Sequence, residues 1–284
     1  MTWRSPHGRT LPDWKARTLL MGIVNVTPDS FSDGGRWTAP EAAAEKAAEL
    51  LAAGADVIDV GAESTRPGAT PVDEAEELRR LLPAIRAIRA RLPDAALSAD
   101  THRAAIARAA IEAGADILND VWGAARAGGR DSLAPVAAAC GCPWILMHNR
   151  AEPASDAAFW PDLLRDVRDA VARAEAAGVR RGQLWLDPGF GFGKTHAQNL
   201  EVLGRLSRLT AIGLPVLLGT SRKSTLGAVL GEASPTARAP GDAACAAWGI
   251  AQGAAMLRVH DVAAIRPVAR MADALRGGAR GWGG

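Results

Sequence analysis

Several apolar stretches of this sequence are followed at once by residues that could do chemistry. Asp100, Asn119 and Asp187 each stand at the end of such a stretch. A carboxylate beside amide groups suits a planar heterocycle with adjacent N–H donors, because one carboxylate accepts two parallel hydrogen bonds. Each residue alone could instead be structural, with its side chain bonded to the backbone. If the three meet at one place, they predict a selective pocket for a flat ring, since an ill-fitting ring would leave buried polar atoms unpaired.

Basic residues form a second group at corresponding points of the sequence. They come with Ser and Thr hydroxyls nearby and comprise Arg66, Arg222, Lys223, Arg258 and His260. Clustered cationic side chains and hydroxyls suit a phosphate or a diphosphate. Each basic residue alone could also be a solvated surface charge, and we assign no role to His148 or Arg150.

The segment 19–35 joins an apolar run to a loop of unusual composition. Residues 19–26 are apolar and partly β-branched, which is typical of a strand buried on both faces. The Pro, Asp, Ser, Phe and paired Gly that follow in 27–35 cannot continue a strand or a helix. Alone, this loop could be an ordinary connection or a mobile functional loop. Asn25 stands at its root, and a diphosphate beside that amide oxygen would suggest Mg²⁺, which is often held largely by phosphate and water.

Strand-like and helix-like segments alternate along the chain. The predicted strands are 19–26, 57–60, 96–99, 117–118, 144–147, 184–186, 215–218 and 256–259. The predicted helices are 40–53, 73–92, 103–113, 132–139, 162–177, 197–209, 224–230, 241–252 and 262–275. Strict alternation requires parallel strands with helical crossovers, and eight units in about 250 residues fit a single-domain α/β fold, the (β/α)8 TIM barrel. A doubly wound sheet is the main alternative, but the Gly-rich dinucleotide turn typical of that fold is missing after the first strand.

In a (β/α)8 barrel, the chemistry belongs at the carboxyl ends of the strands. All eight predicted ends carry polar residues, including Asp59 near the end of the second strand as well as the residues above. One such residue is often a helix cap, but eight polar ends indicate a single site ringed by every loop. We expect residues 1–17 to be an N-terminal extension, 18–276 the barrel and 277–284 a flexible Gly-rich tail.

Composition narrows the class of protein. The 284-residue chain is 48% hydrophobic and 23% charged, so it can bury a large core. A net charge of +2 gives no indication of nucleic acid or a membrane surface as the main partner. The three cysteines, Cys140, Cys142 and Cys245, fit a reducing compartment, and we expect them to be buried and unbridged. With neither a secretory signal nor an apolar run of membrane-spanning length, we expect a cytoplasmic protein.

Five motifs, in this order, resemble those of dihydropteroate synthases over about residues 19–274. They are the segments 25–35 (NVTPDSFSDGG), 63–68 (ESTRPG), 187–194 (DPGFGFGK), 221–224 (SRKS) and 258–262 (RVHDV). The resemblance implies a transferase of folate biosynthesis, which joins 6-hydroxymethyl-7,8-dihydropterin diphosphate to 4-aminobenzoate and releases diphosphate by an SN1-like substitution. It also implies bound Mg²⁺, small-molecule substrates as partners, and a homodimer with the late helices at its interface.

The same resemblance implies roles for individual residues. Pterin would be bound by Asp100, Asn119, Val121, Met147, Asp187, Phe192, Gly219, Lys223 and Arg258. Diphosphate would be bound by Asn25, Thr65, Arg258 and His260, with Asn25 also holding Mg²⁺. Aminobenzoate would be bordered by Phe31, Arg66, Pro67, Phe192 and Ser224. The catalytic residues would be Asp33, Asp100, Lys223 and Arg258.

Two other functions stay open at this stage. A pterin-binding methyltransferase would share the barrel and the Asp and Asn contacts, but it would have no use for the basic motifs at 221–224 and 258–260. An inactive paralogue that acts as a binding subunit would not need to keep every residue assigned above. Departures from the family pattern, such as Ala62 before Glu63 and the sequence 147–153, remove none of those residues.

Overall fold

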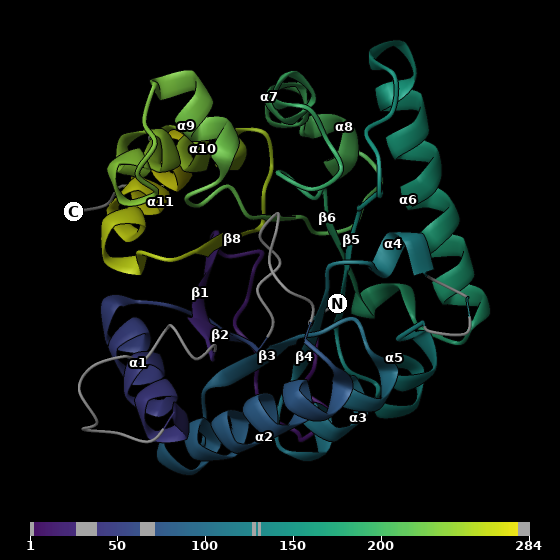
Figure 1. The fold of residues 1–284 in the computed structure, drawn as a ribbon, viewed down its shortest axis with the longest axis vertical. Coiled ribbons are helices and arrows are strands. Elements are labelled where there is room, and N and C mark those ends of the chain that lie inside the picture. Colours follow the sequence, from purple (N-terminus) through teal and green to yellow (C-terminus); the bar gives the residue numbers. More distant parts are fainter. Residues whose placement is uncertain (1–2, 27–38, 63–71, 127–128, 130–131, 278–284) are drawn as a thin grey trace.

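The computed structural model describes residues 3–26, 39–62, 72–126, 129 and 132–277 of the 284-residue chain. Within these residues eight strands alternate with helices (Figure 1). The strands are β1 (Leu19–Asn25), β2 (Val57–Gly61), β3 (Ala96–Asp100), β4 (Ile117–Asp120), β5 (Trp144–Met147), β6 (Leu184–Asp187), β7 (Leu217–Leu218) and β8 (Met256–Val259). The helices are α1 (Ala39–Ala53), α2 (Glu74–Arg91), α3 (Ala104–Glu112), α4 (Gly123–Arg126), α5 (Ala134–Cys140), α6 (Phe159–Ala176), α7 (His196–Gly204), α8 (Ser207–Thr210), α9 (Ser224–Leu230), α10 (Ala239–Ala251) and α11 (Val262–Gly277).

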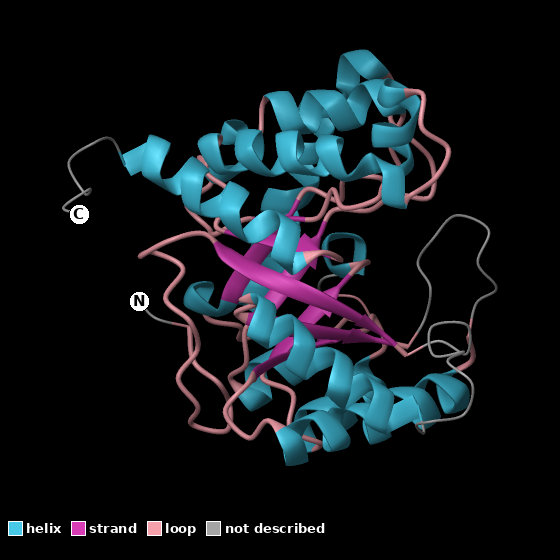
Figure 2. Cartoon of the chain, turned by 90° about the vertical axis from the view of Figure 1, so that its left-hand side faces the viewer, coloured by secondary structure: helices cyan, strands magenta, loops and turns pink. Residues whose placement is uncertain are grey.

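The strands form one parallel sheet that closes on itself. Its order is β6-β5-β4-β3-β2-β1-β8-β7, and an isolated parallel bridge between Leu186 and Val216 connects β6 to the residue just before β7. Helices flank the strands on both sides in the view of Figure 2. The predicted (β/α)8 barrel is therefore confirmed, and the doubly wound alternative is wrong.

Some predicted boundaries differ from those observed. Helix α6 begins at Phe159, three residues before the predicted start, because Phe159 and Trp160 are both buried and extend its apolar face. Strand β7 is only Leu217–Leu218, although Val216 still bridges to β6. The predicted helix 197–209 is two helices, α7 and α8, and the short helix α4 was not predicted. Helix α11 includes Gly277, where we had expected the tail to begin.

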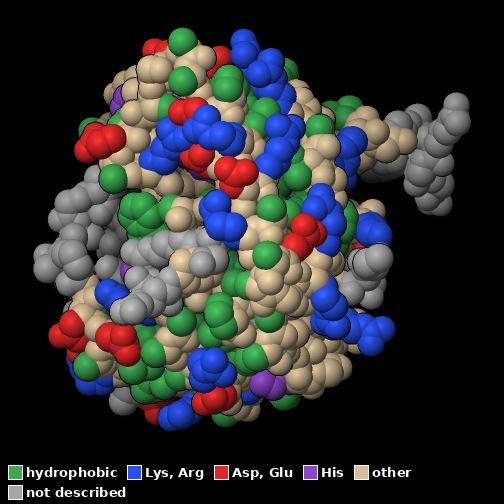
Figure 3. All heavy atoms as spheres, turned by 90° about the vertical axis from the view of Figure 1, so that its right-hand side faces the viewer, with side chains coloured by type: hydrophobic (Ala, Val, Ile, Leu, Met, Phe, Trp, Pro, Cys, Tyr) green, Lys and Arg blue, Asp and Glu red, His purple; other side chains and the backbone are tan. Residues whose placement is uncertain are grey.

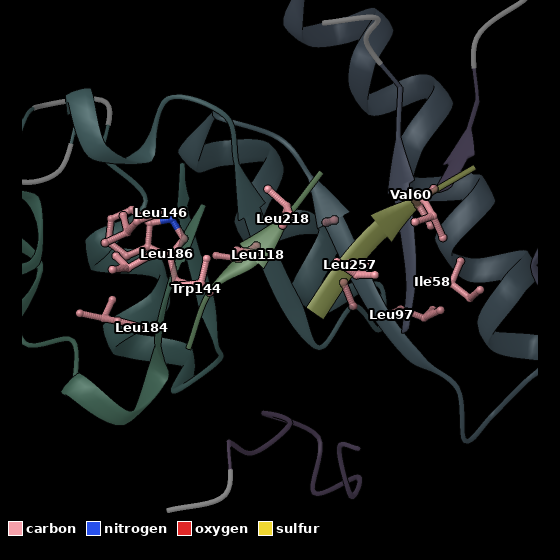
Figure 4. Close-up of a cluster of buried hydrophobic side chains, with 14 of the residues drawn as sticks. Ile58, Val60, Leu97, Leu118, Trp144, Leu146, Leu184, Leu186, Leu218 and Leu257 are labelled. Atoms are coloured by element: carbon pink, nitrogen blue, oxygen red, sulfur yellow. The ribbon is translucent and has the colours of Figure 1, made fainter. Parts of the chain in front are cut away.

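The main core lies between the barrel and its helices. Strand residues alternate between the two faces of the sheet, and the outward-facing residues of most strands are buried against the surrounding helices. Figure 4 shows part of this cluster, including Ile58, Leu97, Trp144 and Leu257. A smaller cluster lies inside the barrel, and it is formed by inward-facing residues such as Met21, Val57, Ile117, Ile145 and Trp185.

The N-terminal segment packs against the lower end of the barrel, where the strands begin. Trp3 and Trp14 contact Trp185 of β6, with ring centroids 4.7 Å and 5.7 Å apart. Arg9 binds the buried carboxylate of Asp116, which directly precedes β4. The predicted extension thus covers the interior at the end opposite to the polar strand ends.

The surface and the cysteines test three expectations drawn from the composition. In the described part of the chain no helix combines the length and the apolar character needed to cross a membrane. On the face that contains α6, basic and acidic side chains are interspersed (Figure 3). The cysteines are free, but only Cys142 is buried, so the prediction was wrong for Cys140 and Cys245, which are partly exposed at the end of α5 and on α10.

Candidate functional site

The interior of the barrel changes from apolar to polar toward the carboxyl ends of the strands. The sheet register places Asp59 of β2 beside Ser98 of β3, and Asp100 of β3 beside Asn119 of β4. On the other side of the barrel it places Met147 beside Asp187. Side chains of one strand face the interior at every second position. Apolar residues that point inward, such as Val57, Ile117 and Trp185, therefore precede this layer on their strands. The polar strand ends therefore converge above an apolar floor.

Arg258 of β8 joins the two halves of this polar layer. Its Nε donates to Asp59 Oδ2 (2.7 Å), and one of its terminal nitrogens donates to Asp100 Oδ2 (2.8 Å). Asn119 Nδ2 donates to the same Asp59 oxygen (3.1 Å). The predicted residues Arg258, Asp100 and Asn119 are thus brought together, and Asp59 is the group that links them.

Burial shifts the ionisation of the site. It raises the pKa of Asp100 from 3.8 to about 7, against the opposing charge of Arg258 and with a further rise from the carboxylate of Asp59. Burial also raises the pKa of Asp187 to about 6, although the Gly189 N–H and Lys223 counteract it. Burial alone would lower the pKa of Arg258, but the carboxylates of Asp59 and Asp100 raise it above its ordinary value. Near neutral pH the site therefore contains Arg258 as a permanent cation, and the carboxyl groups of Asp100 and Asp187 have pKa values close to neutrality.

The loop after β6 carries the next predicted residues. Asp187 Oδ1 accepts a hydrogen bond from Gly189 N (2.7 Å), which fixes the carboxylate at the start of the loop. Lys223 Nζ lies 3.9 Å from the centre of the Phe192 ring, so a cation–π contact joins this loop to the one after β7. The structure thus groups Asp187, Phe192 and Lys223 on one side of the barrel mouth.

Four further predicted residues lie around the same mouth. Met147 ends β5 and Val121 follows β4, and both are buried. Gly219 follows β7, and a side chain there would be in van der Waals contact with Arg258. Ser224 is the first residue of α9, directly after Lys223. These four residues therefore lie beside the polar layer, where the pocket was predicted.

His260 is held by a chain of hydrogen bonds that the sequence did not indicate. Its Nδ1 lies 3.1 Å from Ser221 Oγ, and that hydroxyl donates to Asp242 Oδ2 on α10 (3.3 Å). Asp242 also accepts from the backbone N–H of Arg222 (3.1 Å), a residue with a positive φ of 61°. A left-handed conformation is unfavourable for arginine, so Asp242 stabilises the turn that carries the basic motif.

Other predicted residues lie outside the described ranges. These are Phe31, Asp33, Thr65, Arg66 and Pro67. Asn25 is described: it ends β1, is partly exposed, and its side chain makes no hydrogen bond with another described residue. Its amide oxygen is thus available to a hard cation, although the described residues contain no cluster of three or more acidic, His or Cys side chains that could hold a metal. A single amide oxygen fits Mg²⁺ only where phosphate and water supply the remaining ligands.

Sequence reasoning missed three functional candidates. Asp59 was noted only as a polar strand end, yet a charge inside the otherwise apolar run 57–60 was a signal for a buried ion pair. Asp242 gave no signal, since an acid in the first turn of a helix is common. Lys194 was part of a motif but had no role assigned.

A pocket of about 330 Å³ lies outside the barrel, between α4, α6 and the chain after β5. Its lining includes Trp122, His148, Arg150, Asp166 and Arg173, and none of the residues predicted to bind substrate. Arg150 forms ion pairs there with Asp166 (2.6 Å) and with Asp162 of α6 (3.2 Å). Arg150, left unassigned from the sequence, thus ties the loop after β5 to α6.

The chain is similar to known proteins in both sequence and structure. A family model described as pterin binding enzyme matches residues 21–260. The dihydropteroate synthase of Bacillus subtilis is 45% identical over 262 residues, which are 92% of this chain and 90% of that protein. A crystal structure of the Clostridium difficile dihydropteroate synthase in the presence of pteroic acid superimposes with a TM-score of 0.87 at 41% identity, covering 93% of this chain and 99% of that one. The Xanthomonas albilineans enzyme in complex with 7,8-dihydropteroate gives a TM-score of 0.83 at 39% identity, covering 92% and 95%.

Proposed function

The chain belongs to the dihydropteroate synthase family, and we infer that its barrel joins 6-hydroxymethyl-7,8-dihydropterin diphosphate to 4-aminobenzoate with release of diphosphate. The relatives share the fold over nearly the whole chain, and one of them binds 7,8-dihydropteroate. The observation that carries the assignment is the buried group in which Arg258 bridges Asp59 and Asp100 beside Asn119. Such a group suits a ring with several N–H donors and a charged substituent.

We propose that the pterin ring lies across Asp100, Asn119 and Asp187. An ionised Asp100 can accept two parallel N–H bonds from the ring, whereas a protonated one cannot. Lys223 and Phe192, already in contact, would cover the ring from the side of the β7 loop. Met147, Val121 and Gly219 would complete the slot, with Arg258 stacked on the ring.

We propose that the leaving diphosphate is bound by residues at or after the ends of β1, β2 and β8. Arg258 and His260 are described, and Thr65 is proposed from its motif. Asn25 would hold Mg²⁺ together with the diphosphate oxygens and water. The bound ion supplies positive charge that stabilises the leaving group. Arg258 is suited to share that task because its charge is permanent and already oriented by two carboxylates.

The reaction breaks the bond between the methylene carbon and the diphosphate oxygen and forms a bond from that carbon to the aminobenzoate nitrogen. The amine then loses one proton to solvent. We propose an SN1-like order, in which C–O cleavage leads, because the electron-rich dihydropterin ring stabilises positive charge on the methylene. Asp100, and Asp33 from the first loop, would stabilise that charge, and no covalent nucleophile is then required. Phe31, Arg66, Pro67, Phe192 and Ser224 would border the aminobenzoate.

A homodimer is proposed from the late helices. Large apolar side chains are exposed on α7, α9, α10 and α11, and they are Leu200, Val229, Leu230, Trp248, Met271 and Leu275. These helices adjoin one another, with α10 in contact with α7, α9 and α11 (Figure 1). Several large exposed apolar side chains on adjoining helices are typical of an interface. Trp248→Glu should convert a dimer to a monomer in light scattering after gel filtration, and a wild-type chain that is monomeric at micromolar concentration would contradict the proposal.

A diphosphate-release assay tests the function directly. With the pterin diphosphate and Mg²⁺, release should require 4-aminobenzoate, and its absence would contradict the assignment. Asp33→Ala should bind pterin but turn over slowly, whereas Asp100→Asn and Lys223→Ala should lose pterin binding. Cobalamin binding in an absorption spectrum would favour the methyltransferase instead, and a stoichiometric partner without turnover would favour the inactive subunit. We also place the enzyme in the cytoplasm, in keeping with its free cysteines, and cell fractionation tests this.

A further inference from the structure

Lys194 lies at the end of the loop that follows β6, and its side chain turns back toward that loop. Its ammonium group contacts the carbonyl oxygens of Phe192 (2.9 Å) and Gly189 (3.0 Å) of that loop. It also contacts the carbonyl oxygen of His148 (3.3 Å) and the ring Nδ1 of His148 (3.1 Å), in the chain after β5. One side chain thus joins two neighbouring strand ends of the barrel.

We propose that Lys194 is a positioning residue for pterin binding, holding the loop that carries Asp187 and Phe192 in its binding conformation. The inference rests on the proposed function, since it assigns a purpose to a loop of that site. Lys194 need not touch substrate to act in this way. Its effect passes through the backbone of the loop to the two side chains that face the ring.

Four acceptor atoms surround the Lys194 nitrogen, so its three N–H donors are shared among them. An ammonium has three N–H donors and no acceptor, so it can serve several carbonyl oxygens at once. Burial lowers the pKa of His148 to about 3, and the charge of Lys194 adds to this, so the ring is neutral and one nitrogen can accept. The other nitrogen, Nε2, then carries the proton and faces Asp166 Oδ2 at 3.4 Å. A neutral side chain in place of Lys194 would leave these acceptors without their donor.

Glycines allow the loop to lie directly against the chain after β5. Gly189 and Gly193 have positive φ values of 68° and 51°. A side chain at Gly189 would clash with the carbonyl oxygen of His148, and one at Gly193 would clash with the carbonyl oxygen of Arg150. This close approach is what lets one ammonium reach carbonyl groups of both segments. The contact is thus built into the backbone path of the motif.

The two proposed pterin contacts are attached to the carbonyl groups that Lys194 binds. Gly189, whose carbonyl accepts from Lys194, donates its own N–H to the Asp187 carboxylate (2.7 Å). Phe192, whose carbonyl also accepts from Lys194, packs its ring against Lys223. Loss of the ammonium therefore removes a restraint on the backbone that positions Asp187 and Phe192. Since the loop binds pterin before and during the reaction alike, substrate affinity should suffer more than the chemical step.

The test is Lys194→Met, which keeps approximately the length of the side chain and removes its N–H donors. Lys46→Met on α1 is the matched control, because Lys46 is exposed and, among the described residues, pairs with Glu49 on its own helix. We expect Lys194→Met to raise the KM for pterin diphosphate about tenfold while kcat changes less than about threefold. Calorimetric titration of pterin diphosphate without aminobenzoate should show a matching loss of affinity. Lys46→Met should match the wild type.

A role in folding alone gives a different result. A variant that is partly unfolded loses active molecules, so its kcat falls while the KM of the remaining molecules stays at the wild-type value. That result, or a KM within twofold of wild type, would overturn the proposal. Failure of the proposed function is distinguishable, because wild type and Lys46→Met would then release no diphosphate either.

Discussion

Burial is the main cause of the raised pKa of Asp100, and the charge of Asp59 adds to it, which the variant Asp59→Asn tests. Both carboxylates bind the guanidinium of Arg258, and the charge of Asp59 contributes to the raised pKa of Asp100, which is about 7. Because only the ionised Asp100 can accept two N–H bonds, pterin affinity of the wild type should rise with pH through about 7. Asn in place of Asp59 removes a negative charge near Asp100. It also removes the carboxylate that competes with Asp100 for the guanidinium of Arg258. Both changes favour the ionised form, so the midpoint should move to lower pH.

The size of the shift follows from the geometry. Two like charges on opposite sides of one guanidinium repel by about 2 to 3 kcal/mol at an effective dielectric constant of about 20. One pH unit in a pKa corresponds to about 1.4 kcal/mol. Allowing for relaxation of the site, the midpoint should fall by about 1 to 2 pH units. Asp187, whose pKa is about 6, should give a second and lower step in both proteins.

Calorimetric titration of pterin diphosphate between pH 5 and 9, without aminobenzoate, measures the midpoint. Asp100→Asn should bind weakly at every pH and lack the upper step. Asp56→Asn is the matched control, because Asp56 also pairs with an arginine, Arg17 (2.5 Å), but at the opposite end of β2. An unchanged or higher midpoint in Asp59→Asn would refute the reasoning, as would an equal shift in Asp56→Asn.

Two further predictions concern stability. Burial raises the pKa of Asp100 in the folded protein above its unfolded value. The stability that Asp100 contributes is therefore present below about pH 4 and is lost as pH rises through about 7. Chemical denaturation of the ligand-free enzyme should show this fall in the free energy of unfolding, and the fall should be smaller in Asp100→Asn. Gly189→Ala should lower the free energy of unfolding by more than about 3 kcal/mol, because the new methyl group meets the His148 carbonyl at a positive φ. Gly213→Ala, at a positive φ in open space, should lower it by only about 1 kcal/mol, and equal losses would contradict this account.

The sequence predicted the fold and the composition of the site better than its internal contacts. Alternating segments and eight polar strand ends were sufficient for the barrel and for placing Asp100, Asn119 and Arg258 at one mouth. The importance of Asp59 could not be predicted in the same way, because it depends on the sheet register that turns its carboxylate inward. The contact from Asp242 to Ser221 depends on how α10 packs over the β7 loop, which no local pattern specifies.

The apolar floor of the barrel strengthens the interactions between the charges of the polar layer above it. Trp3 and Trp14 pack on Trp185 and close the barrel at the end where the strands begin. The polar layer therefore lies at the other end of the barrel, above an apolar floor. Such a floor keeps the local dielectric low, and charges above it interact more strongly than they would in water. Asp59 Oδ1 and Ser98 Oγ, on adjacent strands, have no hydrogen-bond partner among the described residues. The site therefore contains buried acceptor oxygens to which the N–H donors of a pterin ring could bind. It follows that pterin should stabilise the enzyme against unfolding more strongly above pH 7 than below it, because only there is Asp100 ionised and in need of those donors.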